Sequence, residues 1–296
     1  MSRRLSDESI EAWLGDVRAH VAMKAPDLLE LLDTYIGEAR FGRRYVAPEL
    51  ARLSPSARIL EVGAGAMLLS CQLRREGFEV TALEPFGGGF SHFVRMQALV
   101  LERARALGCL PRILDCPAEK LTETAVFEFA FSVNVMEHVD NVKACIVNVC
   151  ASIRPGARYR FTCPNYLFPY EPHFNIPTLF SKQVTEKLLG RKIFRGGDLS
   201  ALRATWNSLN WINVRQIRRI VAGEPALKVS FDRRFLIGTL ERVVADPAFS
   251  SRRSSWLRAV IAAMVKSRLH YLVRLVPAMC QPIVDCTIMR TTQGAA

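Results

Sequence analysis

One continuous segment, residues 58–85, constrains the fold of this 296-residue chain more than any other. It opens with an apolar-rich run at 59–62, turns through Gly63-Ala64-Gly65, and continues in a helical pattern that begins near Met67. A strand that is apolar on both faces is typical of a sheet covered by helices on both sides. Glycine permits the sharp turn from such a strand into a helix, and a second strand follows at 79–83. The segment therefore predicts one strand-helix-strand unit of a parallel α/β sheet.

An acidic residue, Glu84, ends the second strand, 21 residues after Gly63. Backbone N–H groups of a glycine turn at a helix N-terminus attract polar ligand groups, and a carboxylate at this distance can bind the two hydroxyls of a ribose. A dinucleotide dehydrogenase would typically have glycine at position 68, where this chain has Leu68. The pattern predicts a nucleotide-binding unit and disfavours nicotinamide dinucleotides.

The run Glu61-Val62-Gly63-Ala64-Gly65 resembles the first motif of class I S-adenosylmethionine-dependent methyltransferases, Glu-x-Gly-x-Gly. Families with a third glycine would place it at 67, where this chain has Met67. The resemblance implies S-adenosyl-L-methionine as cofactor, bound through Glu61, Gly63, Ala64, Gly65 and Glu84.

Two later segments extend the resemblance. Residues 116–121 are similar to the stretch that these enzymes place against adenine, which implies contacts from Ala118 and from either Asp115 or Glu119. Residues 127–139 are similar to the fourth strand and the Glu-His-Val that ends it beside the transferable methyl group, with glutamate where aspartate is usual at 128. This implies that Asn134 contacts the cofactor and that Glu137 and His138 lie near the reaction.

A proline-rich and aromatic loop, residues 166–177, follows the predicted fifth strand. Three prolines predict a stiff loop, and its position predicts that Glu171 and His173 overhang the substrate pocket. The alternative is a surface loop packed by its own aromatic side chains. A histidine, with a pKa near 6.5, can accept the proton that a hydroxyl acceptor loses. We expect this base to be His138 first and His173 second, with Glu137, Glu171 and Tyr170 orienting the acceptor.

A polar and aromatic run, residues 206–213, holds two tryptophans and three asparagines. These side chains could bind a sugar or a base, or they could be the packed start of the following helix. Leading helices before residue 54 could likewise cover the cofactor site or serve as packing.

The net charge of +12 arises entirely in the second part of the chain. Residues 1–160 hold 20 Lys and Arg against 20 Asp and Glu, whereas residues 161–296 hold 20 against 8. Such a surface suits phosphate-bearing partners or an anionic membrane. Residues 256–276 combine apolar residues with interspersed arginines, so they could lie in a membrane surface or pack on the sheet. No apolar window could span a bilayer, and the eight cysteines form no pattern for zinc or disulfides. We therefore expect no metal site and a cytoplasmic protein, with peripheral membrane contact through 256–276 as an option.

The expected fold is α/β, a Rossmann-like doubly wound seven-stranded sheet with an antiparallel last strand, N-terminal helices, and a helical insertion before that strand. We expect one methyltransferase domain, with helices at 1–53, a cofactor-binding core at 54–165, substrate loops and a helix at 166–225, and the last two strands with the basic insertion at 226–296. The expected reaction is methyl transfer to a hydroxyl of a small-molecule or glycan-like acceptor. Alternatives are an RNA methyltransferase, although nucleic acid is the less favoured partner, and a non-catalytic cofactor-binding scaffold. Nothing in the sequence indicates an oligomeric state.

Overall fold

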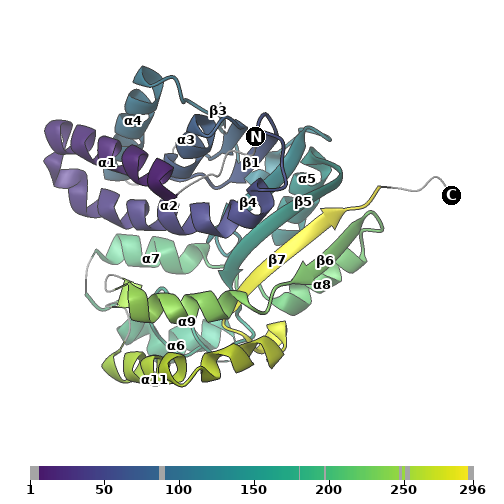
Figure 1. Cartoon of the computed structure of the whole chain (residues 1–296). Coiled ribbons are helices and arrows are strands. Elements are labelled where there is room, and N and C mark those ends of the chain that lie inside the picture. Colours follow the sequence, from purple (N-terminus) through teal and green to yellow (C-terminus); the bar gives the residue numbers. More distant parts are fainter. Residues whose placement is uncertain are drawn as a thin grey trace. The chain divides into compact units, whose positions relative to one another are not determined.

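The computed structural model describes residues 7–86, 91–179, 181–196, 198–246, 249–250 and 254–292. Along them helices and strands alternate as the sequence predicts (Figure 1). The first half contains α1 (Asp7–Lys24), η1 (Pro26–Leu28), α2 (Leu29–Leu50), β1 (Arg58–Val62), α3 (Leu68–Arg75), β2 (Glu79–Leu83), α4 (Ser91–Ala106), β3 (Arg112–Leu114), η2 (Ala118–Lys120), β4 (Phe127–Val133) and α5 (Val142–Ser152). The second half contains β5 (Ile153–Pro164), α6 (Lys182–Ile193), α7 (Leu199–Ser208), α8 (Val214–Ala222), β6 (Leu227–Phe231), α9 (Phe235–Ala245), α11 (Ser255–Lys266), η3 (Leu269–Leu275), η4 (Ala278–Cys280) and β7 (Ile283–Arg290).

The seven strands form one mixed sheet in the order β3-β2-β1-β4-β5-β7-β6. β7, the last strand in the sequence, is antiparallel to the others. β1 pairs in parallel with β2 and β4, and β2 pairs in parallel with β3. The register sets Val62 opposite Leu83, so Gly63 and Glu84 leave the sheet at the same edge. The predicted Rossmann-like fold is confirmed.

The chain divides into two compact units. The first unit contains residues 1–133, 144–159 and 289–296, and the second contains residues 134–143 and 160–288. β5 and β7 contribute residues to both units. The predicted division of a single methyltransferase domain into four segments stays a prediction.

In the first unit, the two N-terminal helices are part of the hydrophobic core. Side chains of α1 and α2 form one buried cluster with side chains of α3 and α4. Trp13 is fully buried, and its indole Nε1 donates a hydrogen bond to the carbonyl oxygen of Leu68 at 2.9 Å. This contact joins α1 to the start of the helix that follows the glycine turn. Packing is therefore one established role of the leading helices.

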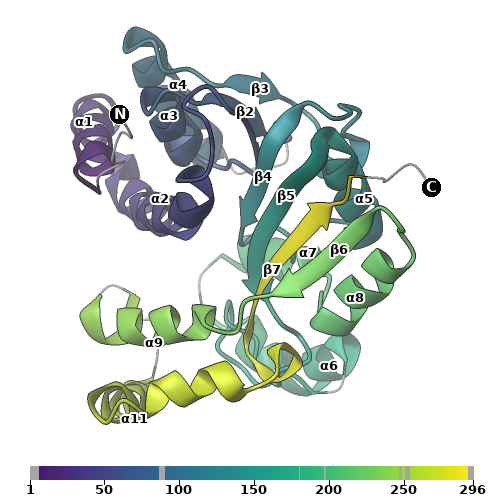
Figure 2. The ribbon, with the colours of Figure 1, turned by 45° about the vertical axis from the view of Figure 1, so that its right-hand side comes forward.

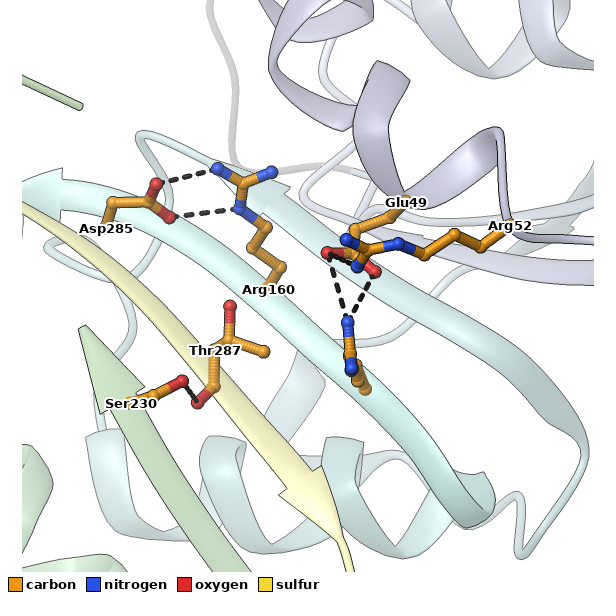
Figure 3. Close-up of polar contacts among 7 residues, drawn as sticks. Glu49, Arg52, Arg160, Ser230, Asp285 and Thr287 are labelled. Atoms are coloured by element: carbon orange, nitrogen blue, oxygen red, sulfur yellow. Dashed lines mark hydrogen bonds and ion pairs between the residues drawn. The ribbon is translucent and has the colours of Figure 1, made fainter. Parts of the chain in front are cut away.

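In the second unit, a buried ion pair joins β5 to β7 (Figure 3). Arg160 donates from Nε and Nη2 to the carboxylate oxygens of Asp285 at 3.1 and 2.7 Å. Figure 3 also shows Ser230 of β6, whose hydroxyl donates to the carbonyl oxygen of Thr287 at 3.4 Å. These polar contacts join β7 to β5 and to β6, its two neighbours in the sheet.

Within the first unit, the end of α2 is bound to β5 by charge. Glu49 accepts hydrogen bonds from Arg52, one turn away, and from Arg158 on the strand. Figure 3 shows Glu49 and Arg52 beside each other.

Between β6 and β7 the predicted helical insertion is present as α9, α11 and η3, with α9 and α11 side by side in Figures 1 and 2. His270 of η3 is buried among them. Its Nε2 lies 3.1 Å from a carboxylate oxygen of Glu241 on α9, and its Nδ1 lies 3.3 Å from the carbonyl oxygen of Met264 on α11. No helix in the described part of the chain is both long and apolar enough to cross a membrane.

Candidate functional site

The glycine turn of the first unit has the backbone that its sequence requires. Gly63 and Gly65 adopt φ angles of 71° and 50°, in the left-handed region that glycine tolerates best. The N–H groups of Gly63 and Ala64 donate to the carbonyl oxygen of Leu83 at 2.8 and 3.3 Å. The turn is thereby bound to the end of β2.

Gly65 has both of its backbone polar groups fixed by side chains. Its N–H donates to Oε2 of Glu84 at 2.9 Å, and its carbonyl oxygen accepts from Nε2 of Gln97 at 2.7 Å. Gln97 is a buried residue of α4 that the sequence did not single out, because it belongs to no motif. The predicted residues Gly65 and Glu84 therefore meet, and a third residue supports them.

Met67 stands where a third glycine would be, and its backbone behaves as a glycine would. Its φ is 63°, which costs a non-glycine residue about 1–2 kcal/mol. Its side chain is completely buried, and burial of a methionine contributes about 1.5–3 kcal/mol. Packing thus offsets the strain at the N-terminus of α3.

Two buried carboxyl groups belong to the same region. Burial, together with the charge of Glu84, raises the pKa of Glu61 to about 8, although a hydrogen bond from the Ser70 hydroxyl opposes the shift. Burial also raises the pKa of Glu84, against the effect of the Gly65 N–H. Glu61 is therefore mainly protonated at neutral pH.

The residues expected near adenine lie beyond β3. Oδ1 of Asp115 accepts the N–H of Phe86 at 2.7 Å, which brings Asp115 next to the segment that holds Glu84. Ala118 is buried at the start of η2, and the carbonyl oxygen of Glu119 accepts from Nδ2 of Asn148 at 2.6 Å. The contact of an adenine amine with the carboxylate of either Asp115 or Glu119 stays a prediction.

Asn134 differs from the other expected cofactor residues because it belongs to the second unit. It follows β4 with φ of 55°, and its N–H donates to the carbonyl oxygen of Thr162 at 2.9 Å. Its contact with a cofactor stays a prediction.

The second unit gathers the expected catalytic residues into a cluster. The rings of His138 and His173 lie 5.4 Å apart, edge to face. Glu137, His138 and His173 each bring one donor atom within 4.8 Å of the others. Such a set could hold a metal ion, so the expected absence of a metal remains a prediction.

His173 is held by a buried carboxylate. Its Nδ1 lies 2.6 Å from Oε1 of Glu171, which also accepts the hydroxyl of Tyr166 at 3.2 Å. The N–H of Phe174 donates to Oε2 of Glu171 at 2.7 Å. Burial by itself would raise the pKa of Glu171, but the hydrogen bond and charge of His173 outweigh it and lower that pKa. Glu171 is thus an ionised acceptor that orients His173.

His138 is held in one tautomer. Its Nδ1 lies 2.8 Å from the Ser208 hydroxyl, which itself donates to the carbonyl oxygen of Thr205 at 2.8 Å. Because the hydroxyl proton is engaged, Nδ1 of His138 is the donor and Nε2 carries the lone pair. Burial and the charge of His173 lower the pKa of His138 to about 4, so the ring is neutral at pH 7.

Asn210 fixes the turn that contains Glu137 and His138. Its Nδ2 donates to the carbonyl oxygens of Met136 and Val139 at 2.8 and 2.7 Å, and its N–H donates to that of Glu137 at 2.8 Å. The sequence suggested a sugar contact for this residue, and the structure gives it a positioning role.

Two neighbouring residues of the run agree with the alternative of packing. Trp206 lies in α7, where it is fully buried and donates to Glu186, and Asn213 caps α8. Trp211 stacks on Tyr166 at 5.2 Å between ring centroids, with a left-handed φ of 59°. Its indole Nε1 is buried and has no hydrogen-bond partner in the described part of the chain. Tyr170 donates to Asn175 at 2.6 Å within its own loop.

A family model described as "Methyltransferase domain" matches residues 38–213. A protein of Mycobacterium tuberculosis H37Rv named "Uncharacterized protein Rv1509" is 44% identical to this chain over 281 residues, which are 95% of both proteins. The ubiquinone biosynthesis O-methyltransferase of Rickettsia felis is 28% identical over 98 residues, 33% of this chain and 37% of that protein. The solved geranyl diphosphate C-methyltransferase of Streptomyces coelicolor A3(2) is similar with 11% identity, 89% of this chain and 81% of that chain covered, and a TM-score of 0.48. The family match covers more than half of the residues, and this chain belongs to the methyltransferase-domain family.

Proposed function

We propose that this enzyme transfers a methyl group from S-adenosylmethionine to a hydroxyl oxygen of a small-molecule or glycan-like acceptor. The first unit supports the donor, because the left-handed glycine turn and the carboxylate of Glu84 lie together at the same edge of the sheet. A carboxylate in this position can accept both ribose hydroxyls. When bound, the cofactor supplies an activated methyl group on a sulfonium.

The single observation that carries the choice of a hydroxyl acceptor is the pairing of His173 with the buried Glu171. A carboxylate on Nδ1 orients the imidazole and stabilises its protonated form, so Nε2 can take a proton. A sulfonium needs no further activation, whereas a hydroxyl must lose its proton during the transfer.

For the two candidate bases we propose the order opposite to the one expected from the sequence. His138 was the first choice from sequence, but its pKa of about 4 makes it a weak proton acceptor at neutral pH. We therefore assign the proton to His173, and we assign to His138 a neutral Nε2 that accepts a hydrogen bond from the acceptor. The buried indole N–H of Trp211, which has no partner among the described residues, is a donor that an acceptor oxygen could satisfy.

Incubation of the enzyme with radiolabelled S-adenosylmethionine and separated glycan, lipid, small-molecule and RNA fractions of its source cells tests this proposal. We expect the label to enter a fraction other than RNA, and we expect the Glu171→Gln variant to transfer much less label to that fraction. Glu224→Gln is the matched control, because it makes the same replacement in the same unit outside the cluster. Label confined to RNA would favour the basic second part as a nucleic-acid surface, and no label in any fraction would favour a scaffold.

A further inference from the structure

The short helix η3 exposes a row of leucines. Leu269, Leu272 and Leu275 are 54%, 55% and 68% exposed. A 3-10 helix has three residues per turn, so side chains three apart eclipse one another. These leucines therefore form a straight apolar row on one side of η3.

The other two rows of η3 differ in character. Tyr271 and Arg274 form a second exposed row, and Arg268, the residue before η3, is also exposed. His270 and Val273 belong to the third row, in which His270 is buried against α9 and α11. Packing within the unit thus uses the third row, while the leucine row stays in solvent.

Helix α11 also exposes apolar side chains. Trp256 and Val260 are exposed one turn apart, while Ile261 is buried. Of the fifteen large hydrophobic side chains exposed in the described residues, seven lie between 256 and 276. A monomer rarely exposes this many in one segment unless the surface has a partner.

The charge of this segment has one sign, and the nearest acidic side chain beside it is Glu241 of α9, which contacts His270. From residue 247 to residue 284 the chain has no aspartate or glutamate, and it has six arginines and lysines. Arg258 and Lys266 of α11 are exposed with the apolar residues. The partner of this surface should therefore be both apolar and anionic.

A basic hollow lies beside the end of η3. It has a volume of about 330 Å³ and is lined in part by Arg218, Arg233, Pro277 and Ala278. The side chain of Gln281 bonds the carbonyl oxygens of Arg233, Val273 and Val276 at 3.1 to 3.2 Å, which fixes η3 next to this hollow. Two guanidinium groups there can bind a phosphate.

We propose that α11 and η3 dock on the surface of an anionic lipid membrane. The leucine row and Trp256 enter the acyl boundary, the arginines and Tyr271 stay at headgroup level, and the hollow between Arg218 and Arg233 binds a lipid phosphate. Apolar residues interleaved with arginine, lysine and tryptophan are the pattern of helices that lie in a membrane interface. RNA binding would not require the leucine row, and a second copy of the chain would oppose the same positive charge.

Vesicle co-sedimentation of the full chain tests the proposal, with one vesicle type of phosphatidylcholine and another of equal parts phosphatidylcholine and phosphatidylglycerol. Binding to the anionic vesicles is expected, and it should decline with salt. The double variant L272D/L275D should weaken it at least roughly tenfold, because two apolar side chains become charged. The matched control is Leu188→Asp, which changes an equally exposed leucine of α6 in the same unit and should bind as the parent does.

Two further measurements keep the result interpretable. Trp256 is the one strongly exposed indole, so its fluorescence should shift to the blue on anionic vesicles, and Trp256→Phe should abolish the shift. Thermal unfolding shows whether each variant is folded. Equal binding of L272D/L275D and the parent would overturn the proposal. So would binding of an RNA oligonucleotide but not of vesicles, or a dimer that forms through the leucine row while vesicles stay unbound.

Discussion

The buried carboxylate of Glu171 lies 2.6 Å from Nδ1 of His173, whose own side chain is 29% exposed. The pair thus joins an ionised group that water does not reach to an imidazole that an acceptor can reach. Proton transfer in the proposed reaction depends on this difference in exposure, because the buried charge stabilises a proton that arrives at the exposed Nε2.

Replacement of Glu171 by glutamine tests that relationship. A neutral amide cannot stabilise protonated His173, so kcat should fall on the order of 100-fold at neutral pH, while the Kd for S-adenosylmethionine stays unchanged. Initial rates with the acceptor and calorimetric titration of the cofactor measure the two quantities. Glu224→Gln, which makes the same replacement in the same unit outside the cluster, is the control and should change kcat little. An unchanged kcat in Glu171→Gln would contradict the base assignment.

Replacement of Glu84 by alanine should weaken cofactor binding. The variant loses the carboxylate that would accept the ribose hydroxyls and that now accepts the Gly65 N–H. Hydrogen bonds to charged groups contribute about 1.5–3 kcal/mol, so a Kd increase of roughly 10- to 100-fold is expected by calorimetry. Glu79→Ala, at the exposed start of the same strand, should leave the Kd unchanged. Binding of NAD in place of S-adenosylmethionine would refute the cofactor proposal.

Glu61 should make the protein less stable as pH rises. Its folded-state pKa of about 8 lies above its ordinary value, so the folded state binds the extra proton between about pH 4.5 and pH 8. The contribution of Glu61 to the free energy of unfolding is fully present below that range and is lost as pH rises through 8. Glu61→Gln stays neutral, so its advantage over the parent should grow by a few kcal/mol across the range. Urea unfolding at several pH values measures this, and parallel pH profiles would show that Glu61 is ionised in the folded protein.

Removal of divalent cations distinguishes two uses of the histidine cluster. Because we assign His173 to proton transfer, treatment with EDTA should leave methyl transfer unchanged. Glu137, His138 and His173 nevertheless have donor atoms close enough for a metal ion. Activity that EDTA abolishes and one divalent cation restores would make the cluster a metal site and exclude His173 as the base.

The Arg160–Asp285 pair should be costly to break. Asp285 is 1% exposed, so Asp285→Ala leaves a buried guanidinium without its carboxylate and should destabilise the protein by about 3–5 kcal/mol. Asp33→Ala removes a similar partner from the exposed Arg18 and should cost much less, because water screens that pair. Chemical denaturation compares the two variants. Equal losses would show that the buried position adds nothing.

The sequence by itself determined the sheet and the glycine turn. The strand at 58–62, the glycines at 63 and 65 and the acidic residue at 84 follow from apolar runs and fixed spacings, and these depend on backbone conformation over a few residues. The family resemblance of residues 127–139 placed Glu137 and His138 among the candidates, and the position of the 166–177 loop after a strand placed Glu171 and His173 there.

Only the tertiary structure decided which groups surround these residues. Asn210 supports the turn of His138 from more than 70 positions away, and Gln97 holds Gly65 from the next helix, although neither residue belongs to a motif. The low pKa of His138 and the exposed leucine row of η3 likewise depend on which neighbours cover a side chain. Spacing along the chain encodes local conformation and the side of an element that is buried, whereas hydrogen-bond partners and desolvation arise from residues that only folding brings together.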